Sequence, residues 1–393
     1  MDLFNNLFIV FSCLLTIPAL VFALQVFLAL RVTEPLGQQA EHRPRVAVLV
    51  PAHNEEEVIA NTLQSITLQL GENDQLLVVA DNCTDNTATI ARKYTTHVIE
   101  RQDESLRGKG YALDFGLQFL EENIPPEIVI IIDADCSLSP ACIDMLAQQA
   151  DIEHRPVQAL YLMEAPKNKS ITQAIAEFAW LVKNHVRPLG LKHLGLPCQL
   201  MGTGMAFPWD ILRRANLAHG NMVEDMKLGI DLATQGYPPL FCPEALVTSE
   251  FPTSQHITHE QRKRWEHGHL STIFNETPGL LKATIQRRDI SLLSMALDLS
   301  VPPLSLLGLC LIVMLSMTIL LTFFTAYIMP LVVMASLSSI FAASVFIAWY
   351  RFGREIVAFK ALCGVPLYIL RKIPLYVAFL IKRQKDWVKT ERR

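Results

Sequence analysis

The stretch Ile128-Val129-Ile130-Ile131-Ile132-Asp133-Ala134-Asp135 decides the fold of this chain. Five consecutive β-branched apolar residues are typical of a strand that is buried on both faces, as in parallel sheets. The strand ends abruptly at two carboxylates. Ligands of open α/β sheets bind at the carboxyl ends of the strands, so we expect Asp133 and Asp135 to point into a binding site.

An Asp-x-Asp pair at the end of a strand has two interpretations. Carboxylate and phosphate oxygens are the ligands that Mg²⁺ and Mn²⁺ prefer, so Asp133 and Asp135 could hold such a cation against a diphosphate. The pair could also cap a helix or form a solvated turn, which Ser137 and Pro140 just downstream would suit. A short motif of this kind does not decide between the two by itself.

The composition indicates that part of the chain lies in lipid. Its 393 residues are 51% hydrophobic and only 18% charged, a charge fraction below that of most soluble domains. The net charge of −4 argues against a nucleic-acid-binding protein, which would carry a basic surplus. Eight cysteines are scattered without a C-x-x-C pair, which predicts reduced thiols and no disulfide framework.

Three apolar segments are predicted to cross a membrane. Segment 7–30 is uncharged and long enough to span about 30 Å of hydrocarbon. It lacks the positive n-region and the cleavage site of a signal peptide. Segment 301–350 has no charged residue and is long enough for two crossings. Arg31, Arg43 and Arg45 after the first crossing predict an external N-terminus and a cytoplasmic domain.

Residues 358–381 are apolar too, but they are interrupted by Lys360, Arg371 and Lys372 and by two prolines. We expect them to lie at the membrane interface, with the basic tail at the lipid head groups. A fourth crossing is the alternative, at the cost of placing charges in lipid. The predicted organisation is an N-terminal anchor and linker (1–42), a cytoplasmic domain (43–285), and two membrane helices followed by interfacial helices and a basic tail (286–393).

Strand and helix patterns alternate through the predicted cytoplasmic domain. This alternation is typical of an α/β fold, with a mostly parallel sheet covered by helices. The predicted strands are 45–50, 75–80, 96–100, 128–132 and 159–163, and the predicted helices are 56–70, 86–93, 109–122 and 140–150.

Polar residues follow three of these strands where each one ends. Because the carboxyl ends of parallel strands meet at one edge of a sheet, they should converge on one cleft that suits a nucleotide. Singly, Asn54 or Glu55 could start a helix, and Asp85 could be an N-cap. Asp81 lacks this explanation, because a cap already exists four residues later. The three groups are Pro51, Ala52, His53, Asn54 and Glu55; Asp81 to Asp85; and Asp133 with Asp135.

Further motifs carry weaker signals. Lys109 stands between two glycines at a helix start, without the spacing of a P-loop. A cation there has the wrong sign for the helix dipole, so a nearby anion such as a diphosphate would account for it. The sequence Gly202-Thr203-Gly204 lets the backbone approach a ligand closely, or makes a tight turn. Glu224 and Asp225 begin a helix, where carboxylates ordinarily suit the dipole.

The sequence Gln261-Arg262-Lys263-Arg264-Trp265 lies on a predicted helix. It could be a solvated basic face, but Trp265 beside Arg264 would be costly to expose. Four nearby histidines lack a cysteine or carboxylate to complete a zinc site, so zinc is not expected. These histidines are His256, His259, His267 and His269.

Together these motifs resemble the membrane-bound family 2 glycosyltransferases, the group of cellulose, chitin, hyaluronan and poly-N-acetylglucosamine synthases and ceramide glucosyltransferases. The resemblance rests on the spaced set of Asp81, Asp133-x-Asp135, Glu224-Asp225 and Gln261-x-x-Arg264-Trp265, and covers residues about 43 to 270 with the flanking membrane helices. It implies a GT-A fold, a nucleotide-diphosphate sugar as donor, UDP-linked by preference, a Mg²⁺ or Mn²⁺ ion, and inversion at the anomeric carbon.

The resemblance also implies roles for single residues. Residues 51–55 and Asp81 would hold the nucleobase and ribose, Asp133 the donor and Asp135 the metal. Asp225, beside Glu224, would be the general base on the acceptor hydroxyl. Gln261 and Arg264 would hold the diphosphate, and Trp265 would stack on the acceptor. Apart from the resemblance, the positions of the remaining residues predict that Lys109 contacts the donor diphosphate and that Gly202, Thr203 and Gly204 approach the acceptor.

The expected function is therefore glycosyl transfer to a polysaccharide or lipid-linked acceptor for cell-surface synthesis. The enzyme would lie in the plasma membrane, the inner membrane of a bacterium, in contact with membrane lipid and with polysaccharide export partners. A processive polymerase and a single-addition glycolipid enzyme both fit, because the few membrane helices leave open whether they form a polymer channel. A non-catalytic scaffold that binds nucleotide or lipid is a more distant alternative, and the uncharged spans argue against a transporter.

Overall fold

The structure, a computed structural model, describes residues 2–32, 43–123, 125–166, 168–218, 223–251, 255–325 and 328–381, with the side chains of 2–9, 255–260, 262 and 380 excepted. The described residues form two compact units. The sheet unit consists of the described parts of 43–166 and 196–268, and the membrane-helix unit of 2–32, 168–195 and 269–381. Residues 168–195, which the sequence pattern places in the cytoplasmic domain, thus group with the apolar helices.

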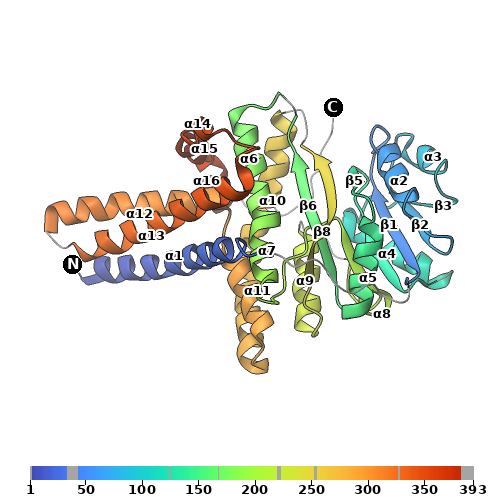
Figure 1. The fold of residues 1–393 in the computed structure, drawn as a ribbon, viewed down its shortest axis with the longest axis horizontal. Helices are drawn as coiled ribbons and strands as arrows, with labels where there is room; N and C mark the ends of the chain where they lie inside the picture. Colours follow the sequence, from blue (N-terminus) through green and yellow to red (C-terminus); the bar gives the residue numbers. More distant parts are fainter. Residues whose placement is uncertain are drawn as a thin grey trace. The chain divides into compact units, whose positions relative to one another are not determined.

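The sheet unit contains an eight-stranded sheet in the order β3-β2-β1-β4-β7-β6-β8-β5 (Figure 1). The pairs β1·β2, β1·β4, β2·β3 and β6·β8 are parallel, which confirms the predicted mostly parallel sheet. The other three pairs are antiparallel. The strands are β1 (Val46–Ala52), β2 (Gln75–Asp81), β3 (His97–Arg101), β4 (Ile128–Ile131), β5 (Cys136–Leu138), β6 (Val157–Glu164), β7 (Met205–Pro208) and β8 (Leu240–Glu250).

Helices connect the strands as the sequence predicts, and α4 has the bounds predicted for it. The helices of this unit are α2 (Ile59–Thr67), α3 (Thr87–Ala91), α4 (Lys109–Glu122), α5 (Cys142–Glu153), α8 (Trp209–Leu212) and α9 (Glu224–Thr234). Helix α10 (Gln255–Arg287) begins in the sheet unit and ends in the membrane-helix unit.

The core of the sheet unit lies between one face of the sheet and helices α4, α8 and α9. Leu49, Val79 and Ile131 turn to this face and are fully buried, because alternate residues of a strand share a face. All four residues of β4 are buried, as predicted for a strand covered on both sides. This packing places the carboxyl end of β4, and the aspartates after it, at the sheet edge beside β1.

The sequence pattern does not predict three of the strands, β5, β7 and β8. β5 and β7 have only three and four residues, too few for a readable period. In β8, Pro243 and Glu244 interrupt the apolar pattern, and β6 pairs around them: Ala159 lies opposite Cys242, whereas Leu160 lies opposite Leu246. Proline has no N–H to donate to a ladder, so a register shift at this point lets the strand continue.

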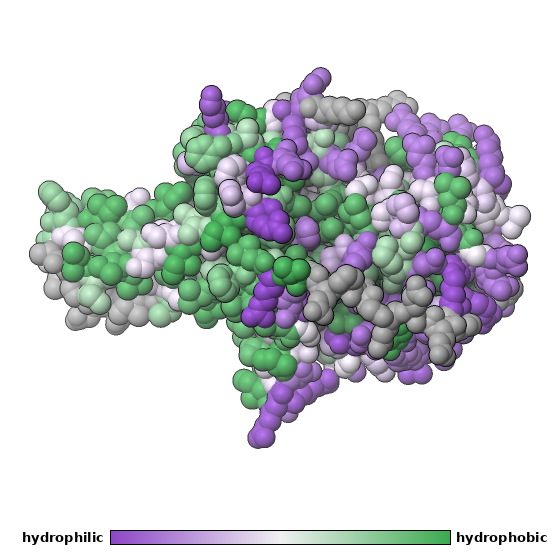
Figure 2. Space-filling model, viewed as in Figure 1, coloured by the Kyte–Doolittle hydropathy of each residue, from purple (hydrophilic) through white to green (hydrophobic). Residues whose placement is uncertain are grey.

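Three long helices of the membrane-helix unit pack side by side: α1 (Asp2–Leu28), α12 (Leu304–Thr325) and α13 (Met329–Ala348) (Figure 1). Ala19, Leu307 and Met334, one from each helix, are completely buried at their centre. Their outer surfaces are apolar (Figure 2), as a lipid-facing bundle requires.

Shorter helices complete the membrane-helix unit. They are α6 (Ile171–Leu181), the π-helix η1 (Val182–Val186), α7 (Arg187–Lys192), α11 (Ile290–Ser300), the π-helix η2 (Trp349–Gly353), α14 (Phe359–Leu362), α15 (Val365–Arg371) and α16 (Ile373–Ile381). Helix α7 docks on the end of α1 through a buried cluster. The Arg187 guanidinium donates to Gln25 Oε1 (2.9 Å) and Asp298 Oδ1 (2.7 Å), and Gln25 Nε2 donates to the same Asp298 oxygen (2.7 Å).

Four segments of the described chain are long and apolar enough to cross a membrane, one more than the sequence analysis expects. They are Val10–Leu28, Leu304–Thr325, Met329–Gly353 and Phe359–Phe379. The fourth is the segment expected at the interface, and it is divided into the short helices α14, α15 and α16. Pro366 and Pro374 lie in the first turns of α15 and α16, where proline is tolerated because it removes no helical hydrogen bond.

Candidate active site

The loops after β1, β2 and β4 meet at one edge of the sheet, because these three strands are adjacent and parallel. The polar residues expected to converge therefore lie on neighbouring loops. The first two loops are joined directly. Asn54 Oδ1 accepts from the Thr84 N–H (2.7 Å), and the Glu55 N–H donates to Thr87 Oγ1 (2.8 Å). His53 Nδ1 lies 2.6 Å from the Asp81 carbonyl oxygen.

Pro51 and Ala52 are the last residues of β1 and belong to the strand. They pair with Val79 and Ala80 of β2. The N-cap of α3 is Asn86 and not Asp85, which lies one residue earlier; Asp85 Oδ1 nevertheless accepts from the Thr87 N–H at the start of the helix (3.0 Å).

Asp81 is almost buried and is held by an arginine that the sequence reasoning missed. Arg101, the last residue of β3, lies opposite Asp81 in the sheet and donates from its guanidinium to Asp81 Oδ1 (2.7 Å). The side chains of Arg101 and Asp81 are only 11% and 9% exposed. Arg101 also lies over the Tyr111 ring at 5.7 Å, a cation–π contact. The signal that could have found it is positional, since both residues end adjacent strands.

Lys109 lies among carboxylates at the start of α4. Its ammonium is 2.5 Å from Asp133 Oδ1 and donates to the Gly202 carbonyl oxygen (2.7 Å). Burial would lower the pKa of Lys109, but Asp133, Glu224 and Asp225 outweigh it and raise that pKa. The nearby anion that its position predicts is therefore the carboxylate group of the site itself, and contact with a diphosphate stays a prediction.

The carboxylates of the site share a crowded, poorly hydrated space. Burial raises the pKa of Glu224 to about 7, and Asp225 and Asp133 add to the effect while Lys109 opposes it. Burial also raises the pKa of Asp133, with Lys109 opposing and Asp135 adding. A carboxyl group that titrates near neutrality can exchange a proton with a substrate. Groups of this kind concentrate at functional sites.

The sequence Gly202-Thr203-Gly204 forms the floor of this space. Gly202 has φ +96°, and a Cβ built there would lie 3.3 Å from Asp225 Oδ2, so glycine lets the chain pass under that carboxylate. The Thr203 side chain has no exposed surface, and its Oγ1 accepts from the Asp133 N–H (3.0 Å). The Thr203 hydroxyl therefore holds the Asp133 backbone from the buried side, and the Thr203 side chain cannot itself contact an acceptor. A Cβ at Gly204 would meet Ala159 at 2.7 Å, so this glycine serves packing.

Arg264 faces the same carboxylates from α10. Burial lowers the pKa of Arg264, while Glu224 and Asp133 oppose that effect. Its Nε is buried and has no hydrogen-bond partner among the described residues. A buried guanidinium N–H without an acceptor costs free energy, and a bound anion would supply the acceptor. Gln261 and Trp265, on the same helix, are half-buried.

Asp133 and Asp135 are the candidate metal ligands. Among the described residues, no three metal-ligating side chains converge. One or two carboxylates are nevertheless a fitting donor set for Mg²⁺ or Mn²⁺, which commonly takes its other ligands from substrate phosphates and water. The buried Arg264 Nε fits the same picture, because a diphosphate would satisfy it and bring the phosphate oxygens.

The chain is similar to known proteins in both sequence and fold. Residues 44–268 match the family model described as Glycosyltransferase like family 2. The probable glycosyltransferase YdaM of Bacillus subtilis (strain 168) is 26% identical over 240 residues, which cover 57% of this chain and 55% of YdaM. This chain thus spans about half the length of that relative.

Among solved structures, the mannosyltransferase PcManGT from Pyrobaculum calidifontis, in complex with GDP-Man and Mn²⁺, is similar with a TM-score of 0.54. It is 18% identical, and the match covers 96% of this chain and 99% of that chain. Glucosyl-3-phosphoglycerate synthase from Mycobacterium tuberculosis, in complex with Mn²⁺, UDP-glucose and phosphoglyceric acid, has a TM-score of 0.36 and 24% identity, over 50% of this chain and 69% of that chain.

Proposed function

Since this chain belongs to the glycosyltransferase family 2 and has the GT-A fold, we propose that it is an inverting, metal-dependent membrane glycosyltransferase. It takes its sugar from a nucleotide-diphosphate sugar, a UDP-sugar by preference, and transfers it to a lipid-linked or glycan acceptor at the membrane. The observation that carries the proposal is one cluster of charged side chains. In this cluster Lys109 and Arg264 lie near three carboxylates, which are those of Asp133, Glu224 and Asp225.

The geometry suggests how the reaction proceeds. The acceptor hydroxyl oxygen attacks the anomeric carbon, a new C–O bond forms, and the bond to the diphosphate oxygen breaks. Asp225 takes the hydroxyl proton, and the nucleoside diphosphate leaves with the electron pair of the broken bond. Arg264 stabilises the charge that grows on the diphosphate, through the Nε–H that lacks a partner among the described residues.

Asp133 and Asp135 would hold the divalent cation, which neutralises the diphosphate as it leaves. Lys109 holds Asp133 in place and offsets the charge of Glu224. A single base suffices for inversion, so a second, nucleophilic carboxylate is not required. We assign the binding of the nucleoside to Asp81 and the loop of residues 53–55.

The membrane helices favour single addition to a lipid-linked acceptor over polymer export by this chain alone. Helices α1, α12 and α13 pack directly on one another, and Ala19, Leu307 and Met334 are fully buried between them. A close-packed apolar interior has no room for a hydrated sugar chain. A polymer would therefore need a path supplied by a second copy or by an export partner.

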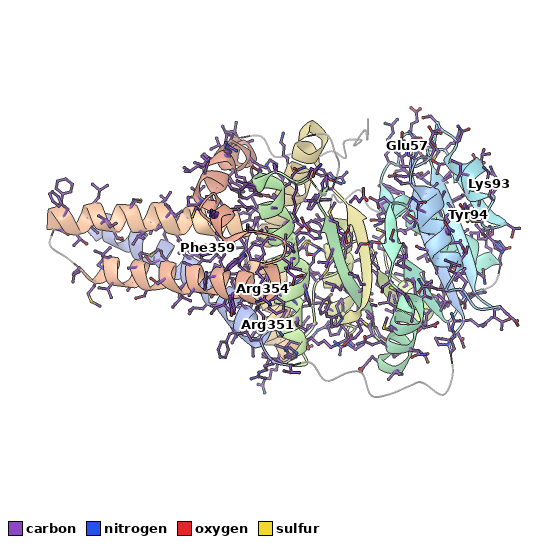
Figure 3. The ribbon with its side chains drawn as sticks, turned by 45° about the horizontal axis from the view of Figure 1, so that its top comes forward. Glu57, Lys93, Tyr94, Arg351, Arg354 and Phe359 are labelled. Atoms are coloured by element: carbon purple, nitrogen blue, oxygen red, sulfur yellow. The ribbon has the colours of Figure 1, made fainter. Side chains whose placement is uncertain are left out.

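The proposed orientation has the N-terminus outside and the sheet unit in the cytoplasm. Arg351, Arg354 and Phe359 lie together near the end of α13 (Figure 3). Arg351 and Arg354 contact the aromatic rings of Phe352 and Tyr350. Cations with aromatic rings at the end of a span are typical of its cytoplasmic interface. We place the helices α14 to α16 in the same interface, with the plasma membrane as the location.

The test is nucleotide release by the detergent-purified protein from a panel of UDP- and GDP-sugars with Mn²⁺ or Mg²⁺ and membrane lipid extract. We expect one donor to be cleaved, with loss of release on adding chelator and in Asp225→Asn. The matched control is Asp231→Asn on the same helix, which should retain activity. A folded wild-type protein that releases nucleotide from no donor would favour a scaffold.

A further inference from the structure

We propose that Gln158 is a positioning residue for glycosyl transfer, whose buried side chain holds the loop 201–204 under the reactive carboxylates. The inference rests on the proposed function, because it concerns the same site. Gln158 is the second residue of β6 and has no exposed surface. It lies in an apolar strand pattern and outside every motif of the sequence analysis.

The Gln158 amide is fully engaged. Its Oε1 accepts from the Met201 N–H (2.7 Å), and its Nε2 donates to the carbonyl oxygens of Thr203 (2.9 Å) and Ala159 (2.9 Å). Nε2 has two protons, so both are used. A buried amide is costly unless it is bonded in this way. Two of its three hydrogen bonds end on the loop.

The loop in turn touches the reacting groups. The Gly202 carbonyl oxygen accepts from Lys109 Nζ (2.7 Å), and Thr203 Oγ1 accepts from the Asp133 N–H (3.0 Å). The Gly202 Cα lies under Asp225, as the 3.3 Å distance from a built Cβ to Asp225 Oδ2 shows. Gln158 therefore hydrogen-bonds directly to the loop that lies beside both Lys109 and the base, Asp225.

Other hydrogen bonds also hold this loop. Besides Lys109 at Gly202 and Asp133 at Thr203, the Gly204 N–H donates to the Ile131 carbonyl oxygen (3.0 Å), and the Gly204 carbonyl oxygen accepts from the Ala159 N–H (2.7 Å). The last two bonds attach Gly204 to the sheet. At Met201 and Thr203 the backbone is held by Gln158, so the position of Gly202 between them depends on that side chain as well as on Lys109.

The first test is Gln158→Met, which keeps the length of the side chain but makes none of these hydrogen bonds. Gln158 makes no hydrogen bond to the groups proposed to bind the donor, which are Asp81, Arg264 and the cation ligands Asp133 and Asp135; its bonds go to Ala159, Thr203 and Met201. We expect the Kd of nucleoside diphosphate with Mn²⁺ to stay within about twofold of wild type. Turnover at saturating donor, per nucleotide-binding site, should fall about 10- to 100-fold, as for a small misplacement of reacting groups.

Leu120→Ala is the matched structural control, because Leu120 is fully buried in the same unit, at the far end of α4 from Lys109. A loss of stability without a positioning effect should lower the number of binding sites in this variant but leave turnover per site unchanged. Equal turnover per site in Gln158→Met and wild type would overturn the proposal.

A second pair of variants approaches the loop from its other side and serves if Gln158→Met does not fold. Thr203→Val removes the acceptor of the Asp133 N–H and should lower turnover with unchanged nucleotide binding, whereas Thr203→Ser keeps the hydroxyl and should restore it. A Thr203→Val protein with wild-type turnover would show that the loop does not position the site.

Hydrogen exchange separates this inference from the proposed function. The Met201 amide should exchange at least about tenfold faster in Gln158→Met, with β1 and β2 unchanged, since its N–H loses the acceptor Gln158 Oε1. Unchanged exchange would overturn the inference even in an active enzyme. A wild-type protein inactive with every donor would overturn the proposed function, while the exchange result would still decide the loop.

Discussion

Lys109 Nζ lies 2.5 Å from Asp133 Oδ1. The lysine is the first residue of α4, and the aspartate lies just after the end of β4. The pair joins the two motifs that the sequence presents separately. It also explains a cation at a helix N-terminus, because the surrounding carboxylates outweigh the unfavourable helix dipole.

Replacing Lys109 with methionine should disable the site. Loss of the ammonium leaves Asp133 without its ion-pair partner and Arg264 as the remaining cation beside Asp133 and Glu224, and breaking an ion pair that is shielded from water is destabilising. We expect at least a 100-fold loss of nucleotide release, about the size of effect that misplaced reacting groups produce, and a lower melting temperature. Lys93→Met, at an exposed position in the same unit, is the control. Near-normal release by Lys109→Met would remove the lysine from the mechanism.

Arg101→Ala should weaken nucleotide binding more than turnover. The substitution removes the donor 2.7 Å from Asp81 Oδ1, so the carboxylate loses its orientation. We expect the Kd of the nucleoside diphosphate, measured by calorimetry with Mn²⁺, to rise about tenfold, equivalent to about 1.4 kcal/mol. Arg92→Ala should not change it, because Arg92 is exposed and pairs with Glu100. An equal Kd in Arg101→Ala would separate Asp81 from nucleoside recognition.

Gly202→Ala and Gly236→Ala form a matched pair. Both glycines have positive φ, +96° and +103°, so alanine introduces backbone strain of about 1 kcal/mol at either position. Only at Gly202 does the new methyl group approach the base, since a Cβ at Gly236 has nothing within 4 Å. Both variants should melt slightly earlier, but only Gly202→Ala should lose turnover. Equal turnover in the two would mean that Gly202 is not next to the acceptor.

The raised pKa of Glu224 predicts how stability depends on pH. A folded-state pKa of about 7 against an ordinary 4.5 means that the folded protein holds this proton more tightly. Its contribution is thus fully present below about pH 4.5 and is lost as the pH rises through 7. Glu224→Gln lacks the titration, so it should lie within about 1 kcal/mol of wild type at pH 5 and exceed it by up to about 3 kcal/mol at pH 8.5.

Thermal unfolding of both proteins without nucleotide or metal measures this difference. The comparison between the two proteins cancels the titration of every other group that Glu224→Gln leaves unchanged. A gap between the two melting temperatures that is the same at pH 5 and pH 8.5 would contradict the raised pKa of Glu224.

Gly190→Ala should destabilise the membrane-helix unit. A Cβ at Gly190 would lie 2.1 Å from the Gln25 carbonyl oxygen, so α7 would have to move away from α1 and strain the Arg187 cluster. Overpacking of this kind typically costs about 1–3 kcal/mol. Gly279→Ala, in α10 with nothing within 4 Å, should instead raise the melting temperature in detergent, because alanine favours a helix. Opposite shifts are the expected result, and equal ones would refute the close packing.

Local patterns were enough to predict much of the sheet unit. The apolar run of β4 requires burial on both faces wherever the strand lies, and residues 109–122 carry the helical period that α4 shows. The parallel direction of β1, β2 and β4 follows from their alternation with helices. These features depend on residues close in the chain.

Other features depend on residues far apart in the chain. β8 pairs with β6 across 80 residues around Pro243, and residues 168–195 leave the sheet unit because Arg187 and Gly190 bind α1 and α11. Gln158 and Arg101 carry no motif, and their importance comes from the loop and the aspartate beside them. The local period of apolar residues in the sequence contains no information about such a pairing.

The sequence by itself determined the family, the mostly parallel sheet, the long apolar helices and the acidic residues of the site, because apolar period and motif spacing are local properties. Only the tertiary structure decided which cation holds which carboxylate, that the Thr203 side chain is buried, and which apolar residues the three long helices bury between them. The physical reason is that burial and ion pairing depend on distances between residues that only folding brings together.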